Sequence, residues 1–119
     1  MVKMNDRNSK TKKQPGACVL PCVYHTNTGF SDDCDVPMEQ MLEGAIAHGI
    51  ETLAITDHYD PGYPDPEFPF QLDFSRYLPA LQAVQTKYRD KIEILAGMEI
   101  GLLKGHFEEA PRAVDRYPF

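Results

Sequence analysis

The chain has 119 residues, which is enough for one domain with a modest core and too few for two. No apolar run approaches the ~20 residues that a membrane-spanning helix needs, so the composition argues against a membrane role. The formal net charge is −6, but residues 1–13 hold five basic groups and one acidic group, so the remainder carries −10. Because such an acidic body repels nucleic-acid phosphates, we also expect no nucleic-acid partner.

Residues 1–16 are expected to form a disordered basic tail. They are polar, rich in Lys and Asn, and end in Gln-Pro-Gly, so they cannot bury enough apolar surface to offset the entropy of ordering. They also lack the apolar stretch of a signal peptide. The cysteines are odd in number and form no C-x-x-C pair, which favours reduced thiols in a cytoplasmic protein over a disulfide framework or a zinc site. They are Cys18, Cys22 and Cys34.

Residues 17–119 are expected to form the single folded unit, with strands and helices in alternation. The apolar segment 18–24 predicts a first strand, which Pro21 makes irregular or confines to a sheet edge. Apolar residues at helical spacing then predict a helix over 37–48, with a proline in its first turn. Gly49 is expected to end that helix in a left-handed conformation.

The second half of the chain continues the alternation. The expected elements are a strand over 51–56, a long proline-rich loop over 60–69, a helix over about 73–88, a strand over 92–96 that runs on to 100, and a helix over 107–117. Either Asp73 or Ser75 is a suitable N-cap for the middle helix, and Pro79 is expected within or just past its first turn.

This βαβαβα alternation predicts an α/β fold in which helices pack outside parallel strands. Three βα units do not close a barrel, which typically takes ~250 residues, and an open doubly wound sheet also needs more strands. We therefore expect unpaired strand edges, through which the chain would self-associate or take up a partner chain.

Functional groups in parallel α/β folds collect at the carboxyl ends of the strands. That rule selects His25 and Asn27 after the first expected strand, His58 after the second and Glu99 after the third. Asp33 lies in the loop that follows the first strand. Imidazoles and carboxylates together form a mixed nitrogen and oxygen donor set that suits Zn, Mn or Fe.

These residues also have purely structural interpretations. A histidine at a strand end is often no more than a partly exposed polar residue. The acidic loop around Asp32, Asp33 and Asp35 can be solvated, or can favour the N-terminus of the helix that follows. His48 is expected at a helix C-terminus, where it suits the helix dipole, so we assign it no catalytic role, and His106 is left without a role.

Three stretches resemble, in order and spacing, the opening motifs of PHP-domain phosphoesterases. They are Tyr24–Asp33, Ala54–His58 and Ala96–Gly101. The resemblance to the histidinol-phosphatase branch of that family covers about residues 23–119, and it extends to Leu72-Asp-Phe and to the closing Arg-Tyr-Pro-Phe.

The resemblance implies a distorted (β/α) barrel with two or three divalent metal ions, Zn, Mn or Fe, that hydrolyses L-histidinol phosphate to L-histidinol and phosphate in histidine biosynthesis. By position, His25 corresponds to the first histidine of an H-x-H motif, Asp33 and His58 to further metal ligands, and Glu99 to a bridging carboxylate. Glu99 and His58 are the residues expected to carry catalysis. The metals would neutralise phosphate oxygens and activate a bound water for attack on phosphorus.

Two positions depart from the family pattern: Asn27 stands where the second histidine of the motif belongs, and Val23 stands where an Asp is usual. An amide ligates transition metals poorly compared with an imidazole. The later family motifs would lie beyond Phe119, so we expect an incomplete PHP barrel, as a fragment or a truncated gene product. The alternative is a catalytically inactive PHP remnant or half-barrel that binds metal weakly or assembles with a partner chain.

Overall fold

The computed structural model describes residues 21–119. The expected basic tail over 1–16, the first residues of the expected strand and Cys18 lie outside the described residues. The centre of the fold is a three-stranded sheet in the order β1-β2-β4, with both pairs of neighbours parallel. The expected α/β fold with parallel strands is therefore confirmed. The bounds are Cys22–Val23 for β1, Thr52–Ile55 for β2 and Glu93–Ala96 for β4.

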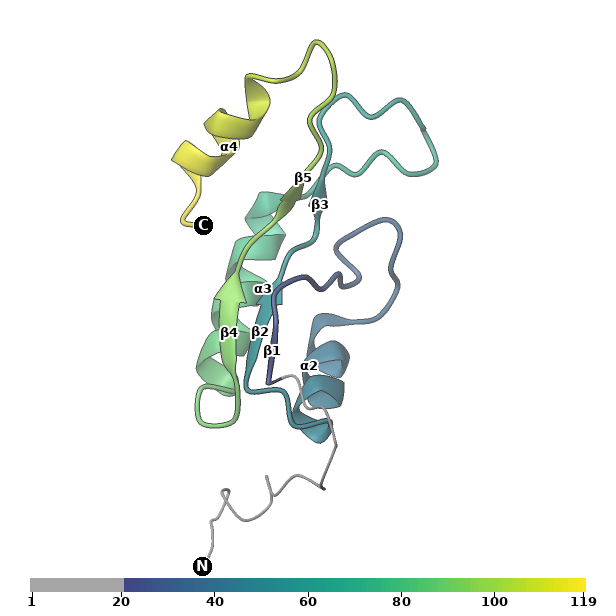
Figure 1. Ribbon diagram of the computed structural model, residues 1–119. Coiled ribbons are helices and arrows are strands. Elements are labelled where there is room, and N and C mark those ends of the chain that lie inside the picture. Colours follow the sequence, from purple (N-terminus) through teal and green to yellow (C-terminus); the bar gives the residue numbers. More distant parts are fainter. Residues whose placement is uncertain (1–20) are drawn as a thin grey trace, which may run out of the picture.

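Two helices form the crossovers between these strands: α2, Met38–Ala47, joins β1 to β2, and α3, Phe74–Lys87, joins β2 to β4 (Figure 1). One apolar cluster unites both helices with the sheet. It includes Leu42 of α2, Leu53 and Ile55 of β2, Tyr77, Leu81 and Val84 of α3, and Ile94 of β4. Each fully buried side chain of this size stabilises the fold by about 1.5–3 kcal/mol, so the cluster supplies most of the free energy that holds the sheet in place.

The helix ends follow the sequence closely. The Asp73 carboxylate accepts a hydrogen bond from the Ser75 backbone N–H at 3.1 Å, which confirms it as the N-cap of α3. Gly49 has φ 80°, and the N–H of Ile50 bonds to the Ala45 carbonyl at 3.0 Å, as in a Schellman C-cap.

One proline and the last helix differ slightly from expectation. Pro37 is the N-cap of α2 rather than a residue of its first turn. Pro79 lies just past the first turn of α3, as expected, where it removes one backbone hydrogen bond without ending the helix. The last helix, α4, spans Glu109–Arg116 and is shorter than expected, with Pro111 in its first turn, where its missing N–H has no cost.

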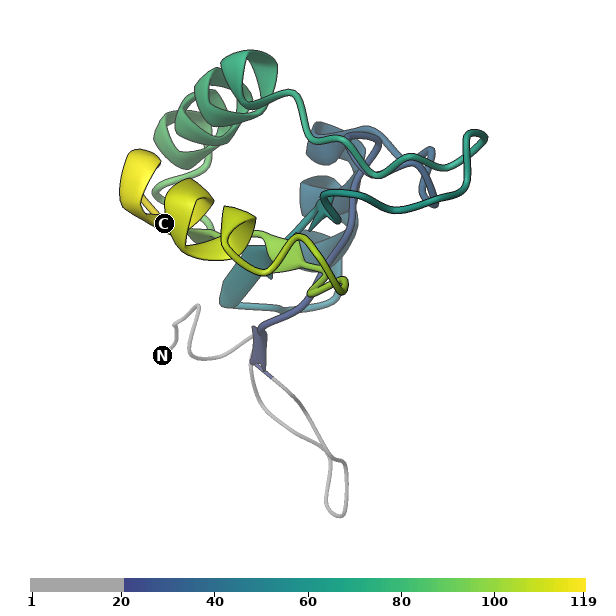
Figure 2. The same cartoon turned by 90° about the horizontal axis from the view of Figure 1, so that it is seen from above.

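A second, two-stranded sheet was not expected from the sequence. It consists of β3, His58–Tyr59, and β5, Glu99–Ile100, which pair in parallel and continue the direction of β2 and β4 (Figure 1). The N–H groups of Gly97, Glu99 and Gly101 bond to the carbonyls of Ile55, Asp57 and Tyr59 at 2.9–3.2 Å, so one ladder runs through both sheets. In the view from above, the loop between β3 and α3 projects to the side opposite α3 and α4 (Figure 2). Among residues 21–119, no helix is long and apolar enough to cross a membrane.

Candidate metal centre

The pairing of β3 with β5 determines which side chains meet at the carboxyl end of the sheet. His58 and Glu99 are direct partners in that ladder, so their side chains stand beside one another. The Glu99 Oε1 atom lies 3.3 Å from His58 Nε2 and 3.4 Å from His25 Nε2. Asp33 reaches the same histidine from the loop after β1, with its Oδ2 atom 3.5 Å from His58 Nε2. The structure thus brings together all four residues that the sequence selected as metal ligands.

The spacing of these atoms suits pairs of donors around a metal ion. Donors bound tetrahedrally at about 2.1 Å lie about 3.4 Å from one another. The three distances between the histidine nitrogens and the carboxylate oxygens are close to this value, at 3.3–3.5 Å. Within residues 21–119, however, no three His, Cys, Asp or Glu side chains are arranged to hold one ion by themselves. An ion bound here would take two donors from a pair of these residues and fill its other positions with water, substrate or other groups.

The electrostatics of Glu99 also favour a cation. Its Oε1 atom is buried and has no hydrogen-bond partner among the described residues. When both facing histidines are neutral with unprotonated Nε2 atoms, lone pairs would point at this carboxylate oxygen from two sides. A proton or a metal ion between the atoms removes that repulsion, because buried polar atoms without partners are costly.

Asn27 contributes the other buried side-chain atom without a partner in the part of the chain that the structure describes. This atom is its amide oxygen, Oδ1. Since a buried acceptor of this kind costs free energy unless water or an ion satisfies it, Asn27 offers a further oxygen donor. The donor set available near this end is therefore richer in oxygen than two imidazoles in an H-x-H motif would make it.

Both histidines have a partner on the ring nitrogen that faces away from Glu99. The Nδ1 atom of His25 lies 2.9 Å from Thr56 Oγ1, and that of His58 lies 3.4 Å from Asp60 Oδ1. When Nδ1 donates its hydrogen to this partner, Nε2 is left as an acceptor, which is the arrangement found in histidines that bind metals. The two rings differ in exposure, at 64% for His25 and 17% for His58.

Sequence reasoning missed the role of Asp57, which is fully buried. Its carboxylate accepts hydrogen bonds from the backbone N–H and the hydroxyl of Thr28 and from the hydroxyl of Ser31. Ser31 in turn accepts from the backbone N–H of His58 at 2.8 Å. Asp57 therefore fastens the loop that carries Asp33 to the strand end that carries His58. A carboxylate inside a Thr-Asp-His sequence gives no signal that it points inward rather than toward a metal.

Tyr77 of α3 supports the same strand ends from the core. Its hydroxyl accepts a hydrogen bond from the backbone N–H of Asp57 at 3.2 Å and donates one to the Gly97 carbonyl at 2.9 Å. Burial raises the pKa of the Tyr77 hydroxyl far above its usual range, so the group stays protonated and keeps both bonds at all ordinary pH values.

The other histidines and cysteines among residues 21–119 lie outside this cluster. His48 bonds to the Gly44 carbonyl through Nδ1 at 2.8 Å, on the exposed end of α2. His106 lies 3.3 Å from Glu109, at the start of α4. Cys22 and Cys34 are free thiols.

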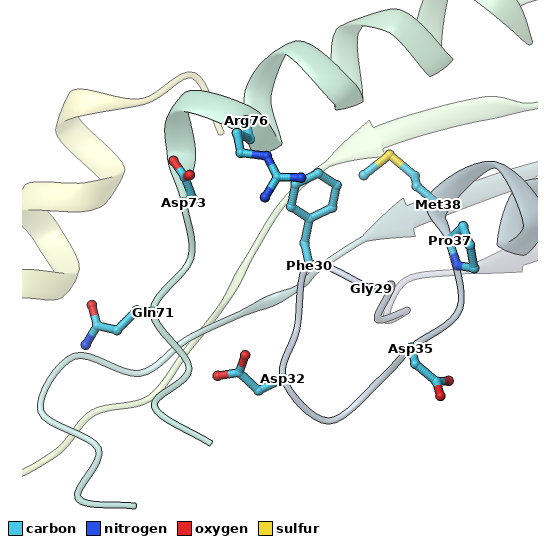
Figure 3. A pocket seen from close by; sticks show the side chains of 9 residues that line it. All are labelled: Gly29, Phe30, Asp32, Asp35, Pro37, Met38, Gln71, Asp73 and Arg76. Atoms are coloured by element: carbon cyan, nitrogen blue, oxygen red, sulfur yellow. The ribbon is translucent and has the colours of Figure 1, made fainter. Parts of the chain in front are cut away.

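A cavity of about 550 Å³ is lined by Asp32, the chain neighbour of Asp33, but by none of the four residues of the cluster. Its walls include three carboxylates and one guanidinium, from Asp32, Asp35, Asp73 and Arg76 (Figure 3). Asp73 caps α3, and Asp32 accepts the Phe70 backbone N–H at 2.6 Å, so two of these carboxylates already serve backbone groups. We therefore take the histidine and carboxylate cluster, rather than this cavity, as the candidate centre.

Parallel strands whose carboxyl ends carry paired imidazoles and carboxylates define the class: an α/β protein with a candidate divalent-metal centre. Comparison with known proteins gives the family, because the family model of the PHP domain matches residues 24–118. The chain belongs to the PHP domain family.

Two relatives are similar over most of the chain. A histidinol-phosphatase of Lactococcus lactis subsp. lactis (strain IL1403) is 31% identical over 96 residues, which are 81% of this chain and 35% of that protein. The crystal structure of a histidinol phosphate phosphatase from the same organism, in complex with Zn, L-histidinol and phosphate, is 29% identical with a TM-score of 0.78. The match covers 86% of this chain and 38% of that structure, so the chain spans little more than a third of either relative.

Proposed function

We propose that this chain carries part of the metal centre of a phosphomonoesterase of the histidinol-phosphatase type. The proposed reaction is the hydrolysis of L-histidinol phosphate to L-histidinol and phosphate, and the proposed scaffold is part of a PHP-type distorted (β/α) barrel. The observation that carries this proposal is the buried Glu99 Oε1, unpartnered in hydrogen bonds and 3.3–3.4 Å from two imidazole Nε2 atoms. The relative crystallised with Zn, L-histidinol and phosphate supports the same chemistry.

In this proposal, His25, Asp33, His58 and Glu99 hold divalent metal ions, with Zn, Mn and Fe as the candidates. Bound metal would supply charge for the phosphate oxygens and acidify a coordinated water. The protein's own part is positioning. Glu99 joins the two histidines, Asp33 approaches His58 from the loop after β1, and the Asp57 hydrogen bonds keep that loop in place.

The test is phosphate release from L-histidinol phosphate by the chain loaded with Mn²⁺ or Zn²⁺. We expect turnover that is lost in Glu99→Ala and in His58→Ala. Two matched controls should keep the activity: Glu108→Gln, an exposed carboxylate, and His48→Gln, an exposed histidine outside the cluster. Turnover that persists in both cluster variants would contradict the proposed roles.

A second candidate function is a metal-binding PHP unit without catalysis of its own, or one that works only when a partner chain completes it. The observation that favours it is that no three donors among residues 21–119 can hold an ion alone. Sheet edges that pair with a second copy would be one route to completion. Metal bound at one equivalent or less without turnover would favour this candidate, and light scattering at several concentrations would report self-association. The expected cytoplasmic location and the lack of a nucleic-acid partner stay predictions.

A further inference from the structure

We infer that Asp60 is a positioning residue for His58, and that Gly101 is a glycine because it must admit the Asp60 carboxylate. This inference rests on the proposed metal role of His58, and it assigns roles to Asp60 and Gly101. Asp60 lies in the segment that the sequence presents as the start of a proline-rich loop. In the structure it is only 8% exposed.

The side chains of His58 and Asp60 point in the same direction. His58 and Asp60 are two residues apart at the end of a strand, so their side chains lie on the same side of the chain. The Asp60 Oδ1 atom is 3.4 Å from His58 Nδ1. That contact places the other ring nitrogen, Nε2, toward Glu99 and Asp33.

Burial of the Asp60 carboxylate costs free energy. A buried carboxylate needs partners that replace its water. Asp60 Oδ1 accepts the backbone N–H of Gly101 at 2.9 Å, so the same oxygen is held between the next strand and the His58 ring. This bond ties the end of β5 to the histidine of β3.

The hydrogen bond between Asp60 and Gly101 requires space at position 101. A Cβ atom at position 101 would lie 2.7 Å from Asp60 Cγ and 2.8 Å from Oδ1, closer than such atoms approach. Gly101 is not among the glycines with positive φ, so its backbone conformation does not require a glycine. The close approach of the Asp60 carboxylate is what requires a glycine at this position. Any larger residue would push that carboxylate away from His58.

Phe70 restrains the same ring from a third direction. Its ring centroid lies 4.6 Å from that of His58. Phe70 has φ 49°, a left-handed conformation that costs a residue with a side chain free energy. Hydrogen bonds hold it there: its carbonyl accepts the Asp60 N–H at 2.9 Å, and its N–H donates to Asp32 at 2.6 Å. The acidic loop after β1 therefore also supports the surroundings of His58.

These contacts predict an asymmetry between the two histidines. His58 is largely buried and has a carboxylate behind it, whereas the exposed His25 has only the Thr56 hydroxyl. A carboxylate behind a ligating imidazole holds its orientation and raises its basicity, and removing such a partner typically lowers metal affinity about 10–100-fold. We therefore expect His58 to contribute more to metal affinity than His25.

The test is Zn²⁺ and Mn²⁺ affinity by calorimetry on the whole chain. Asp60→Ala should weaken binding about 10–100-fold, with partial recovery in Asp60→Asn, whose amide oxygen still accepts a hydrogen bond. Gly101→Ala should weaken binding in the same direction without altering any charged group. Two matched controls should leave the metal affinity unchanged. They are Gly44→Ala, at an exposed helical glycine with nothing within 4 Å of an added Cβ, and Asp65→Asn in the exposed loop.

A second readout reports the His58 ring itself. Nitrogen-detected NMR of the Zn-loaded chain should show His58 bound through Nε2 with its proton on Nδ1, and Asp60→Ala should shift the Nδ1 resonance because the hydrogen bond to Asp60 is lost. Unchanged affinity together with an unchanged Nδ1 resonance in Asp60→Ala would overturn the inference. If the unmodified chain binds neither metal, the proposed function fails, and the inference that rests on it fails too. If Asp60→Ala does not fold, Asp60→Asn and Gly101→Ala decide by the same two measurements.

Discussion

The apolar layer between the sheet and its helices and the polar carboxyl end of the strands are stabilised in different ways. The layer contains Leu42, Ile55 and Leu81, each at most 1% exposed, and depends on burial, which has no direction. The carboxyl end contains Asp57 and Asp60, whose buried carboxylates depend on particular hydrogen bonds. The layer therefore sets how stable the chain is, and the polar end sets where four side chains point.

The largest effect on stability should come from the apolar layer. Leu42→Ala should lower the free energy of unfolding by about 3 kcal/mol, because it removes a fully buried side chain and leaves a cavity. Urea unfolding measures this effect, and Leu102→Ala, at a side chain 66% exposed, is the control that should stay within about 0.5 kcal/mol. Metal affinity of the folded variant should not change. A loss below about 1 kcal/mol would mean that the layer is not the source of stability.

Asp57→Ala should affect both regions at once. We expect a loss of about 2 kcal/mol in the free energy of unfolding, since Thr28 and Ser31 lose a charged acceptor in a buried place. We also expect weaker metal binding, because the loop that carries Asp33 is no longer fastened to the strand end. Unfolding and calorimetric titration of the same preparation measure the two effects. If the free energy of unfolding falls while the metal affinity stays the same, Asp57 stabilises the fold but does not position Asp33.

Asn27→His should act on the polar end alone. An imidazole is a better ligand than an amide for Zn²⁺, whereas an amide oxygen suits Mn²⁺ comparatively well, so the ratio of Zn²⁺ to Mn²⁺ affinity should rise about tenfold. Competition titrations of the two ions measure this ratio. His48→Asn, at the exposed end of α2, is the control and should leave it unchanged. An unaltered ratio in Asn27→His would show that position 27 does not contact the ion.

The smallest effect concerns a helix end that belongs to neither region. Hydrogen bonds from the Ser75 hydroxyl and, to a lesser extent, its backbone N–H lower the pKa of Asp73 from its ordinary value of 3.8. A lowered pKa means that the stabilisation is present above about pH 4 and is lost as the pH falls through the lower value of the folded state. Melting temperatures between pH 2.5 and 6 should therefore show a shallower acid decline in Asp73→Asn, which keeps the cap without the charge. Parallel curves for the two proteins would contradict this.

The same division explains what the sequence could predict. Apolar periodicity, Gly49 and the Asp73 cap predict the helices, because these signals are local. The alternation of strands and helices predicts that the main strands are parallel. His25, Asp33, His58 and Glu99 were also predicted as candidates, since strand ends and motif spacing are visible in a sequence. Their proximity depends on the pairing of β3 with β5, and strands of two residues have no periodicity to detect.

The supporting residues could not be predicted for a related reason. A buried carboxylate such as Asp60 looks, in a sequence, like any acidic residue at the start of a loop. Gly101 looks like a turn glycine, although its role comes from a side chain 41 residues earlier in the chain. Contacts of this kind depend on tertiary structure, which no local pattern encodes.

X-ray absorption spectroscopy at the zinc edge, on the Zn-loaded chain, shows directly whether the histidine and carboxylate cluster holds the ion. We expect a first shell of nitrogen and oxygen donors with outer-shell scattering from imidazole. This scattering should weaken in His58→Ala, and the oxygen count should fall in Glu99→Ala. A shell that contains sulfur, or the same spectrum in the unmodified chain and both variants, would mean that the cluster does not hold the ion.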